Sequence, residues 1–326
     1  MPTLLPRKPF RLWAMAILTM LVATADPALA WPERPVRLVT PSAAGSGGDI
    51  VARTLAEQFS KRWRQPVVVE NRPGADGFLA IEALTTSRDG HTLLVGTHSL
   101  VTVNPLLHGK LPYDPVRDLA PISLLYDDFL AIFASPTLGL KTLADAAGAL
   151  RAKPGKLNYA TVAGSPYLAM LGFLKENGLD AVFVSYRNAN MALPDLAEGR
   201  LQLALLPLAI AKGSVLDGKL KMLAVTNTAR SPAFADVPTV AEAGFPGLTF
   251  GGLIGMFGPK EMNTELRERV AADARRALEE PATKDRLAGL GIAVRGTTPA
   301  EFAAILDEQR AKWAKIAAAH GVRPTQ

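Results

Sequence analysis

The chain has 326 residues, enough for one large domain or two ordinary ones, and 48% of them are hydrophobic and 20% charged. This composition is typical of a globular protein and excludes a disordered or collagen-like chain. Cysteine is absent from the sequence, which excludes disulfides, thiolate nucleophiles and cysteine-ligated metal centres. The formal net charge is +6, but the basic residues are scattered among acids, so we do not expect nucleic-acid binding.

The first thirty residues have the pattern of a secretory signal peptide. Arg7, Lys8 and Arg11 precede an almost wholly apolar run from Leu12 to Ala23, and small residues occupy Ala28-Leu29-Ala30. We therefore expect export and cleavage after Ala30. The alternative, a membrane anchor, is disfavoured because a spanning helix needs about 20 apolar residues and this run is shorter.

Strands and helices are predicted to alternate along the rest of the chain. A β-rich run at 36–40 leads into a Gly-rich stretch at 43–48 and then a helix with an apolar stripe at Val51, Leu55, Phe59 and Trp63. Further strands are predicted at 67–69, 92–96, 129–134, 157–161, 181–186, 201–206, 222–226 and 253–257. A capping box with Pro at the first helical position, at 298–301, opens a C-terminal helix. The alternation predicts an α/β fold whose parallel sheets are covered by helices.

The turn after the first strand has part of a dinucleotide-binding pattern. Its glycines are Gly45, Gly47 and Gly48, but Ile50 stands where the pattern needs a third glycine, so that function is disfavoured. The same turn suits an anion, because the first amides of a helix are unpaired and carry a positive dipole. A plain turn capped by Asp49 remains the alternative.

Signatures of enzymes and metal sites are lacking in the sequence. It contains no G-x-S-x-G elbow, P-loop, H-E-x-x-H or EF-hand pattern. His91 and His98 flank one predicted strand at an odd separation and should point to opposite faces, which makes them poor joint metal ligands. The adjacent acids Asp127 and Asp128 are interpreted as solvated surface. We therefore predict no catalytic residue, no metal and no cofactor.

Short motifs in a characteristic order extend over almost the whole chain after residue 30. They read WPERPVR at 31–37, GGD at 47–49, VVVENRPG at 67–74, RDGHTLL at 88–94, DLAPI at 118–122, PGKLNYA at 154–160, DVPT at 236–239 and TPAEF at 298–302. Each motif alone is weak, but their order and spacing together are specific. In these motifs the chain resembles the Bug-type periplasmic receptors of tripartite tricarboxylate transporters.

The resemblance implies a two-lobed α/β periplasmic binding protein (type II-like), each lobe a mainly parallel sheet flanked by helices. The chain would cross between lobes near 129–134 and near 222–226, so that 31–130 and 226–326 form lobe I and 131–225 form lobe II. The resemblance further implies a monomeric periplasmic receptor that captures a small carboxylate in the interlobe cleft for the membrane subunits of such a transporter. A stand-alone sensor receptor and, less favoured, an exported enzyme on the same scaffold remain alternatives.

The resemblance also places ligand contacts in loops that follow strands. They are Ser46, Gly47, Gly48, Asp49, Ala75, Asp76, Thr97, His98, Ser99, Gly164, Ser165, Tyr186, Arg187 and Asn188. For Thr97, Ser99 and Ser165 the alternative is ordinary helix capping. Two hypotheses follow from this set. Ser165 holds a ligand carboxylate, and Asp76, which departs from the family pattern, meets a donor or cation on the ligand.

Overall fold

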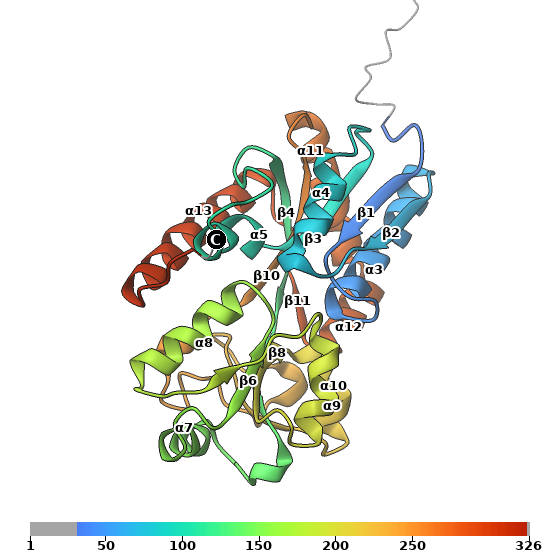
Figure 1. Cartoon of the computed structure of the whole chain (residues 1–326). Coiled ribbons are helices and arrows are strands. Elements are labelled where there is room, and N and C mark those ends of the chain that lie inside the picture. The colour runs from blue at the N-terminus through green and yellow to red at the C-terminus, as the bar shows by residue number, and fades with distance from the viewer. Residues whose placement is uncertain (1–30, 325–326) are drawn as a thin grey trace, which may run out of the picture.

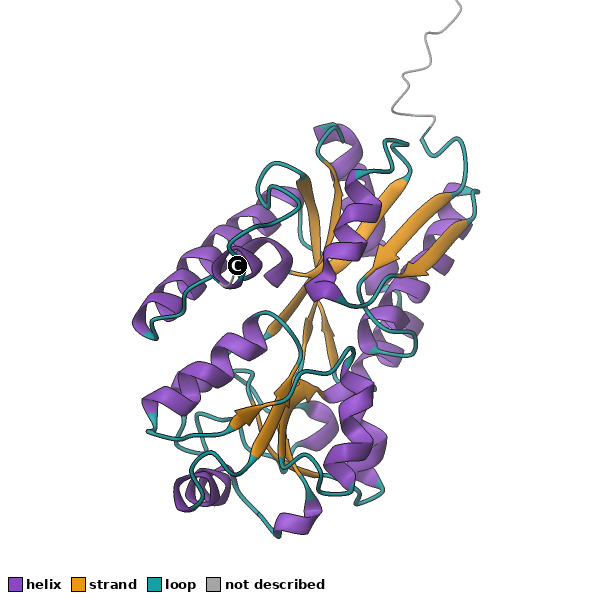
Figure 2. Ribbon diagram, viewed as in Figure 1, coloured by secondary structure: helices purple, strands orange, loops and turns teal. Residues whose placement is uncertain are grey.

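The structure, a computed structural model, describes residues 31–324. The predicted signal peptide lies outside the described residues. Two β-sheets, each flanked by helices, build two lobes that meet along a pair of connecting strands (Figure 1). Figure 2 shows the strands at the centre of each lobe and the helices on the outside. The expected two-lobed α/β architecture is confirmed.

Each lobe has its own sheet. In lobe I the strand order is β11 (Ile292–Val294), β4 (Leu119–Asp128), β10 (Gly252–Pro259), β3 (Thr92–Thr97), β1 (Val36–Thr40) and β2 (Val67–Asn71). In lobe II it is β7 (Val182–Phe183), β6 (Asn158–Thr161), β8 (Leu203–Pro207), β5 (Leu130–Ala134) and β9 (Lys221–Val225).

Both sheets are mixed, whereas mainly parallel sheets were expected. The pairs β1–β2, β1–β3, β6–β7 and β6–β8 are parallel, but β4–β10 and β5–β9 are antiparallel. The reason is the connection between the lobes. A chain that leaves lobe I through β4 and β5 and returns through β9 and β10 runs in opposite directions in neighbouring strands.

The two crossings differ in length. The first is a single residue, because β4 ends at Asp128 and β5 begins at Leu130. The second is long: β9 ends at Val225 and the lobe I sheet resumes at Gly252. Between them, Thr239 forms a bridge to Val225, and the side chains of Val240 and Phe250 join an apolar cluster that contains Ile132 and Leu205 of lobe II. We therefore propose that lobe II extends through Gly251, beyond the boundary expected near 226.

Helices cover both sheets. Lobe I carries α3 (Gly47–Trp63), α4 (Phe78–Thr85), α5 (Ser99–Thr102), α6 (Asn104–Leu107), α11 (Thr264–Glu279), α12 (Pro281–Ala288) and α13 (Pro299–Ala319). Lobe II carries α7 (Leu143–Ala152), α8 (Ser165–Glu176), α9 (Ala192–Ala197) and α10 (Leu208–Leu216). The predicted apolar stripe of α3 is buried, and the predicted capping box opens α13. Across residues 31–324 we find no helix with the length and apolar character needed to cross a membrane.

The sequence patterns missed β4 and β11. Strand β4 contains Pro121, which usually marks a strand edge or a break. Its first eight residues, LAPISLLY, form a nearly continuous run of apolar and small residues. The alternation of apolar and polar residues that reveals a half-buried strand is therefore lacking. This omission matters for the site, because β4 is the strand that leaves lobe I for lobe II.

Candidate functional site

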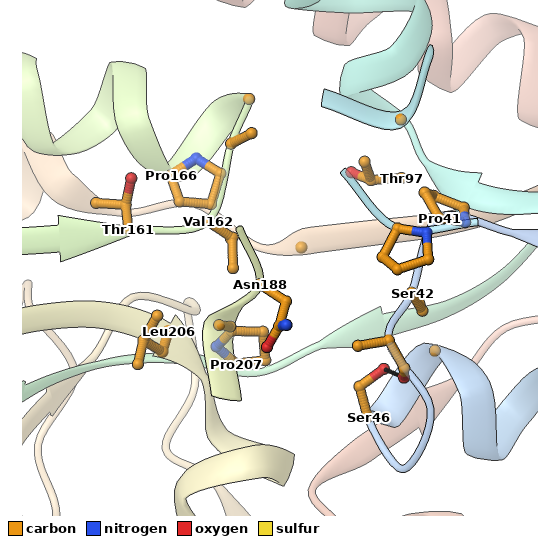
Figure 3. Close-up of a pocket in the computed structure, with 18 of the residues that line it drawn as sticks. Pro41, Ser42, Ser46, Thr97, Thr161, Val162, Pro166, Asn188, Leu206 and Pro207 are labelled. Carbon is orange, nitrogen blue, oxygen red and sulfur yellow. Dashed lines mark hydrogen bonds between the residues drawn. The ribbon is translucent and has the colours of Figure 1, made fainter. Parts of the chain in front are cut away.

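A cavity of about 500 Å³ lies between the lobes. Its walls come from the loops after β1, β2 and β3 of lobe I and from the loops after β6, β7 and β8 of lobe II. Figure 3 shows Thr161, Pro166 and Asn188 of lobe II facing Ser42 and Thr97 of lobe I across this space. The volume is typical of a site for a small organic molecule.

Most of the predicted contact residues line this cavity. They are Ser46, Gly47, Gly48, Ala75, Asp76, Thr97, Ser99, Gly164, Ser165, Tyr186, Arg187 and Asn188. Asp49 and His98 are not among the lining residues. The carboxyl ends of strands meet at the cleft, and this places segments distant in sequence side by side.

Asp49 stabilises the loop after β1 through hydrogen bonds and does not line the cavity. Its Oδ2 accepts hydrogen bonds from the Gly45 N–H at 2.9 Å and from Arg53 Nε at 3.0 Å, and its Oδ1 accepts one from Asn71 Nδ2 at 2.8 Å. Burial acts to raise the pKa of Asp49, but these hydrogen bonds outweigh it and hold the pKa below its usual range. The carboxylate therefore fixes the loop and is directed away from the ligand space.

The start of α3 faces the cavity. Ser46 is the N-cap, but its hydroxyl donates to the carbonyl of Ala43 at 2.7 Å and leaves the helix without a side-chain cap. The chain must pass closely here, because a Cβ on Gly48 would lie 2.1 Å from Ser42 Oγ. The first amides of this 17-residue helix thus meet the cavity with the partial positive charge of the helix dipole. This arrangement suits an anionic group.

The first amide of α8 is hydrogen-bonded to a serine of lobe I. The Ser165 N–H donates to Ser99 Oγ at 3.1 Å, and the two hydroxyl oxygens lie 3.2 Å apart. Ser165 Oγ also lies 3.3 Å from His98 Nε2, while His98 Nδ1 lies 2.9 Å from Thr102 Oγ1. We call His98, Ser99 and Ser165 the latch. It is fully buried, with exposed fractions of 0%, 2% and 1%.

The hydrogen bonds of the latch define the state of His98. Burial lowers its pKa to about 3, so the imidazole is neutral. Thr102 donates its hydroxyl to the carbonyl of His98 at 3.1 Å, so Nδ1–H donates to Thr102 Oγ1 and Nε2 accepts from Ser165. Both donors of Ser165 are therefore used inside the protein. In this arrangement Ser165 has no free donor for a ligand carboxylate, contrary to the hypothesis from the sequence.

The charged groups expected near the ligand have partners or are exposed. Asp76 Oδ2 lies 2.9 Å from His108 Nε2, an ion-pair distance when the imidazole is protonated. The hydroxyl of Tyr186 donates to Asp195 at 2.7 Å, and burial raises its pKa to about 12. Arg187 lines the cavity with an exposed side chain. The sequence hypothesis for Asp76 overlooked His108, which α6 brings to it.

Three buried lining residues that have an unpartnered polar side-chain atom in the described structure were not predicted from the sequence: Tyr126, Asp128 and Thr161. We call them the polar seat. Their exposed fractions are 0%, 8% and 9%. Among residues 31–324, no hydrogen-bond partner reaches Tyr126 Oη, Asp128 Oδ1 or Thr161 Oγ1. The interpretation of Asp128 as solvated surface was wrong, because Asp128 is only 8% exposed at the end of β4, between Gly252 of β10 and Ile292 of β11.

The neighbouring acid behaves differently. Asp127 points to the other side of β4 and pairs with Arg295 at 2.9 Å. Burial raises its pKa despite this pairing. Strand alternation could have separated the two acids in advance, had β4 been recognised. Within the described part of the chain, no group of three or more acidic, histidine or cysteine side chains could hold a metal ion.

Comparison with known proteins identifies relatives of the whole described chain. The family model described as "Tripartite tricarboxylate transporter family receptor" matches residues 51–322. Protein BugT of Bordetella pertussis is 27% identical, over 95% of this chain and 98% of its own length. A protein encoded in the tcbD-tcbE intergenic region of a Pseudomonas species is 29% identical, over 88% of this chain and 86% of its own length.

Solved structures agree with the described fold. A structure of an R. palustris protein with adipate is 29% identical, covers 90% of this chain and 100% of its own, and has a TM-score of 0.86. MatC from Rhodopseudomonas palustris with bound malate is also 29% identical, covers 88% of this chain and 100% of its own, and has a TM-score of 0.82. The periplasmic binding protein BugD, at 27% identity over 90% of this chain and 100% of its own, has a TM-score of 0.83.

Proposed function

Because this chain belongs to the tripartite tricarboxylate transporter receptor family, we propose that its interlobe cavity captures a small carboxylate outside the cytoplasm. The family and its solved members are periplasmic solute-binding receptors and not enzymes, and this chain is a receptor of that kind. The nature of the solute is the part that we propose.

The uncapped start of α3 is the observation that carries the proposal. Its first amides face the cavity, and Gly47 and Gly48 let a ligand come close to the backbone. A carboxylate there would accept hydrogen bonds that a cap residue usually takes. Two structural relatives were solved with the carboxylates adipate and malate, which supports the same ligand class.

We place the remaining ligand contacts in the loops that line the cavity. In lobe I these are the turn at Ala75 and Asp76 and the hydroxyl of Thr97, and in lobe II they are Arg187 and Asn188. The latch supports the closed arrangement without touching the carboxylate. A ligand held between the lobes would stabilise closure, as in other two-lobed receptors.

A thermal-shift screen of residues 31–326 tests the ligand class, with adipate, malate, succinate and benzoate as first probes. A ligand that binds the folded state raises the melting temperature with concentration. The comparison variant is Gly48→Ala, whose Cβ would lie 2.1 Å from Ser42 Oγ and 3.0 Å from Ser42 Cβ, so the Ser42 side chain has to move at the start of α3. The proposal is contradicted if no carboxylate raises the melting temperature, or if the wild type and Gly48→Ala respond equally.

Export and partnership with membrane subunits form the second part of the proposal. We expect the exported chain to begin at Trp31, which intact mass measurement of the periplasmic protein checks. We also expect uptake of the carboxylate to require both the receptor and the membrane subunits. Uptake that persists after deletion of the receptor gene would argue for a different role.

A further inference from the structure

The three residues of the polar seat destabilise the ligand-free protein. Tyr126, Asp128 and Thr161 place polar atoms in the interior, and among residues 31–324 those atoms have no hydrogen-bond partner. A buried polar group without a partner costs about 1–3 kcal/mol, and more when it is charged. Three such atoms lining one cavity indicate that something in the cavity completes their hydrogen bonds.

Asp128 is the group of the polar seat with the most specific chemistry. It shares a face of β4 with Tyr126, and Gly252 of β10 lies opposite it, where an added Cβ would come within 3.1 Å of the Asp128 Cβ. A glycine at position 252 therefore leaves space for the Asp128 side chain. Burial raises the pKa of Asp128 to about 7, and the backbone N–H of Phe129 opposes this shift. Asp128 is poised to ionise when a cation approaches.

The charges around the cavity favour a cation over a second anion. The strands paired with Asp128 place Gly252 and Ile292 beside it, and Asn227 Nδ2 donates to its backbone carbonyl. The titratable and charged groups that line the cavity with it are Tyr126, Tyr186, Asp76 beside His108, and exposed Arg187. Once Asp128 is ionised, it and Asp76 outnumber the one exposed guanidinium, and this balance disfavours the second carboxylate of a dianion.

We propose that Asp128 selects ligands that carry an ammonium group in addition to the carboxylate, with the hydroxyls of Tyr126 and Thr161 completing the seat. The inference rests on the proposed function, since the ligand carboxylate is placed at the start of α3. The ammonium group would donate to Asp128 Oδ1 on the same side of the cavity, since a Cβ on Gly48 would lie 3.6 Å from Tyr126 Oη, which shares a face of β4 with Asp128. This assigns to Asp128 the role that the sequence hypothesis gave to Asp76.

Calorimetry with matched pairs of probes tests the inference. The pairs are L-glutamate with glutarate and 4-aminobutyrate with butyrate, which differ only in the ammonium group. At pH 7.5 we expect at least one ammonium-bearing probe to bind more than tenfold tighter than its partner. Asp128→Asn should remove that preference, and the matched control Asp127→Asn, one residue along on the other face, should keep it.

The pH dependence of wild-type affinity gives a second readout that does not require a variant to fold. Affinity for the ammonium-bearing probe should rise from pH 6 to pH 8 as Asp128 ionises, and the rise should be retained in Asp127→Asn and lost in Asp128→Asn. A wild-type affinity for the ammonium-bearing probe that does not rise between pH 6 and pH 8 would overturn the inference.

The outcomes separate the two proposals. If amine-free carboxylates bind as tightly as their ammonium-bearing partners, the inference about Asp128 fails and the carboxylate receptor stands. If none of the probes and none of the screened carboxylates binds, the proposed function itself fails. If the preference exists but survives in Asp128→Asn, the ammonium group is recognised elsewhere and Asp128 is satisfied by water.

Discussion

The two helix starts that face the cavity, at α3 and α8, look similar in sequence and differ in the folded chain. Each has a small-residue turn followed by a helix of twelve or more residues. At α8 the Ser165 N–H is bonded to Ser99 of the other lobe, whereas at α3 the Ser46 hydroxyl turns back to its own loop. One start therefore joins the lobes, and the other is available to an anion. The same local pattern serves closure in one place and recognition in the other.

The largest expected effect comes from Gly164→Ala at the α8 start. Gly164 has φ +86°, and a Cβ there would lie 2.5 Å from Ser99 Cβ. With ψ −134° this backbone conformation is nearly restricted to glycine and costs about 1–3 kcal/mol for another residue, and the clash would push Ser99 of lobe I away from Gly164 of lobe II. We expect carboxylate affinity to fall by about a hundredfold or more, measured by calorimetry.

The control for this variant is Gly178→Ala. Gly178 has φ +61°, but a Cβ there would meet no described atom within 4 Å. It carries the backbone strain without the clash, so its stability should fall while its affinity stays near wild type. Equal losses of affinity in both variants would show that the contact between Gly164 and Ser99 has no special part in closure.

Asp128→Asn should stabilise the ligand-free chain at high pH. The folded pKa of about 7 lies above the ordinary value of 3.8, so the folded chain keeps a proton that the unfolded chain has lost. Stability from this group is therefore complete below about pH 4 and is lost as the pH rises toward 7. We expect the variant to gain a few kcal/mol at pH 8 and little at pH 4, as measured by urea unfolding. A gain that does not depend on pH would contradict the raised pKa.

The latch should show the opposite dependence on pH. The folded pKa of His98, about 3, lies below the ordinary value of 6.5, so its contribution to stability is present above about pH 6.5 and is lost as the pH falls toward 3. The difference in unfolding free energy between Asp128→Asn and the wild type removes this shared contribution and isolates Asp128.

Ser99→Ala should cost about 1–3 kcal/mol of unfolding free energy, because it leaves the buried Ser165 N–H without its acceptor. The matched variant at the other start is Ser46→Ala, which removes one loop hydrogen bond worth about 0.5–1.5 kcal/mol. Chemical denaturation compares the two. A larger loss at Ser46 would reverse the contrast between the two helix starts.

The smallest effect is expected for Gly47→Ala. A Cβ at Gly47 would lie 3.3 Å from the Ala209 Cβ of lobe II, a tight contact that a shift of a few tenths of an ångström relieves. Calorimetry should show a change of less than about fivefold in carboxylate affinity. A loss of affinity as large as that of Gly164→Ala would mean that an added Cβ is tolerated equally poorly at both helix starts.

Most of the site residues predicted from the sequence line the cavity, but the polar seat was not among them. The loops after β1, β2 and β3 were expected at the cleft, because strand ends and glycine turns are local patterns. Strand β4 was missed because Pro121 and a nearly continuous apolar run hide its period. Without β4, the sequence could not show that Tyr126 and Asp128 share an inward face, and Asp128 was misread as surface.

By itself, then, the amino-acid sequence determined the alternating α/β order, the capping box at the start of α13 and the motifs of a receptor family. These depend on residues near one another in the chain, where spacing and backbone preference decide the outcome. The tertiary structure decided which polar groups remain available. Ser165 is occupied because Ser99, 66 positions away, approaches it. Asp128 is buried where β4 lies between β10 and β11, and its Oδ1 lacks a hydrogen-bond partner among residues 31–324. Such long-range contacts leave no local pattern in the sequence.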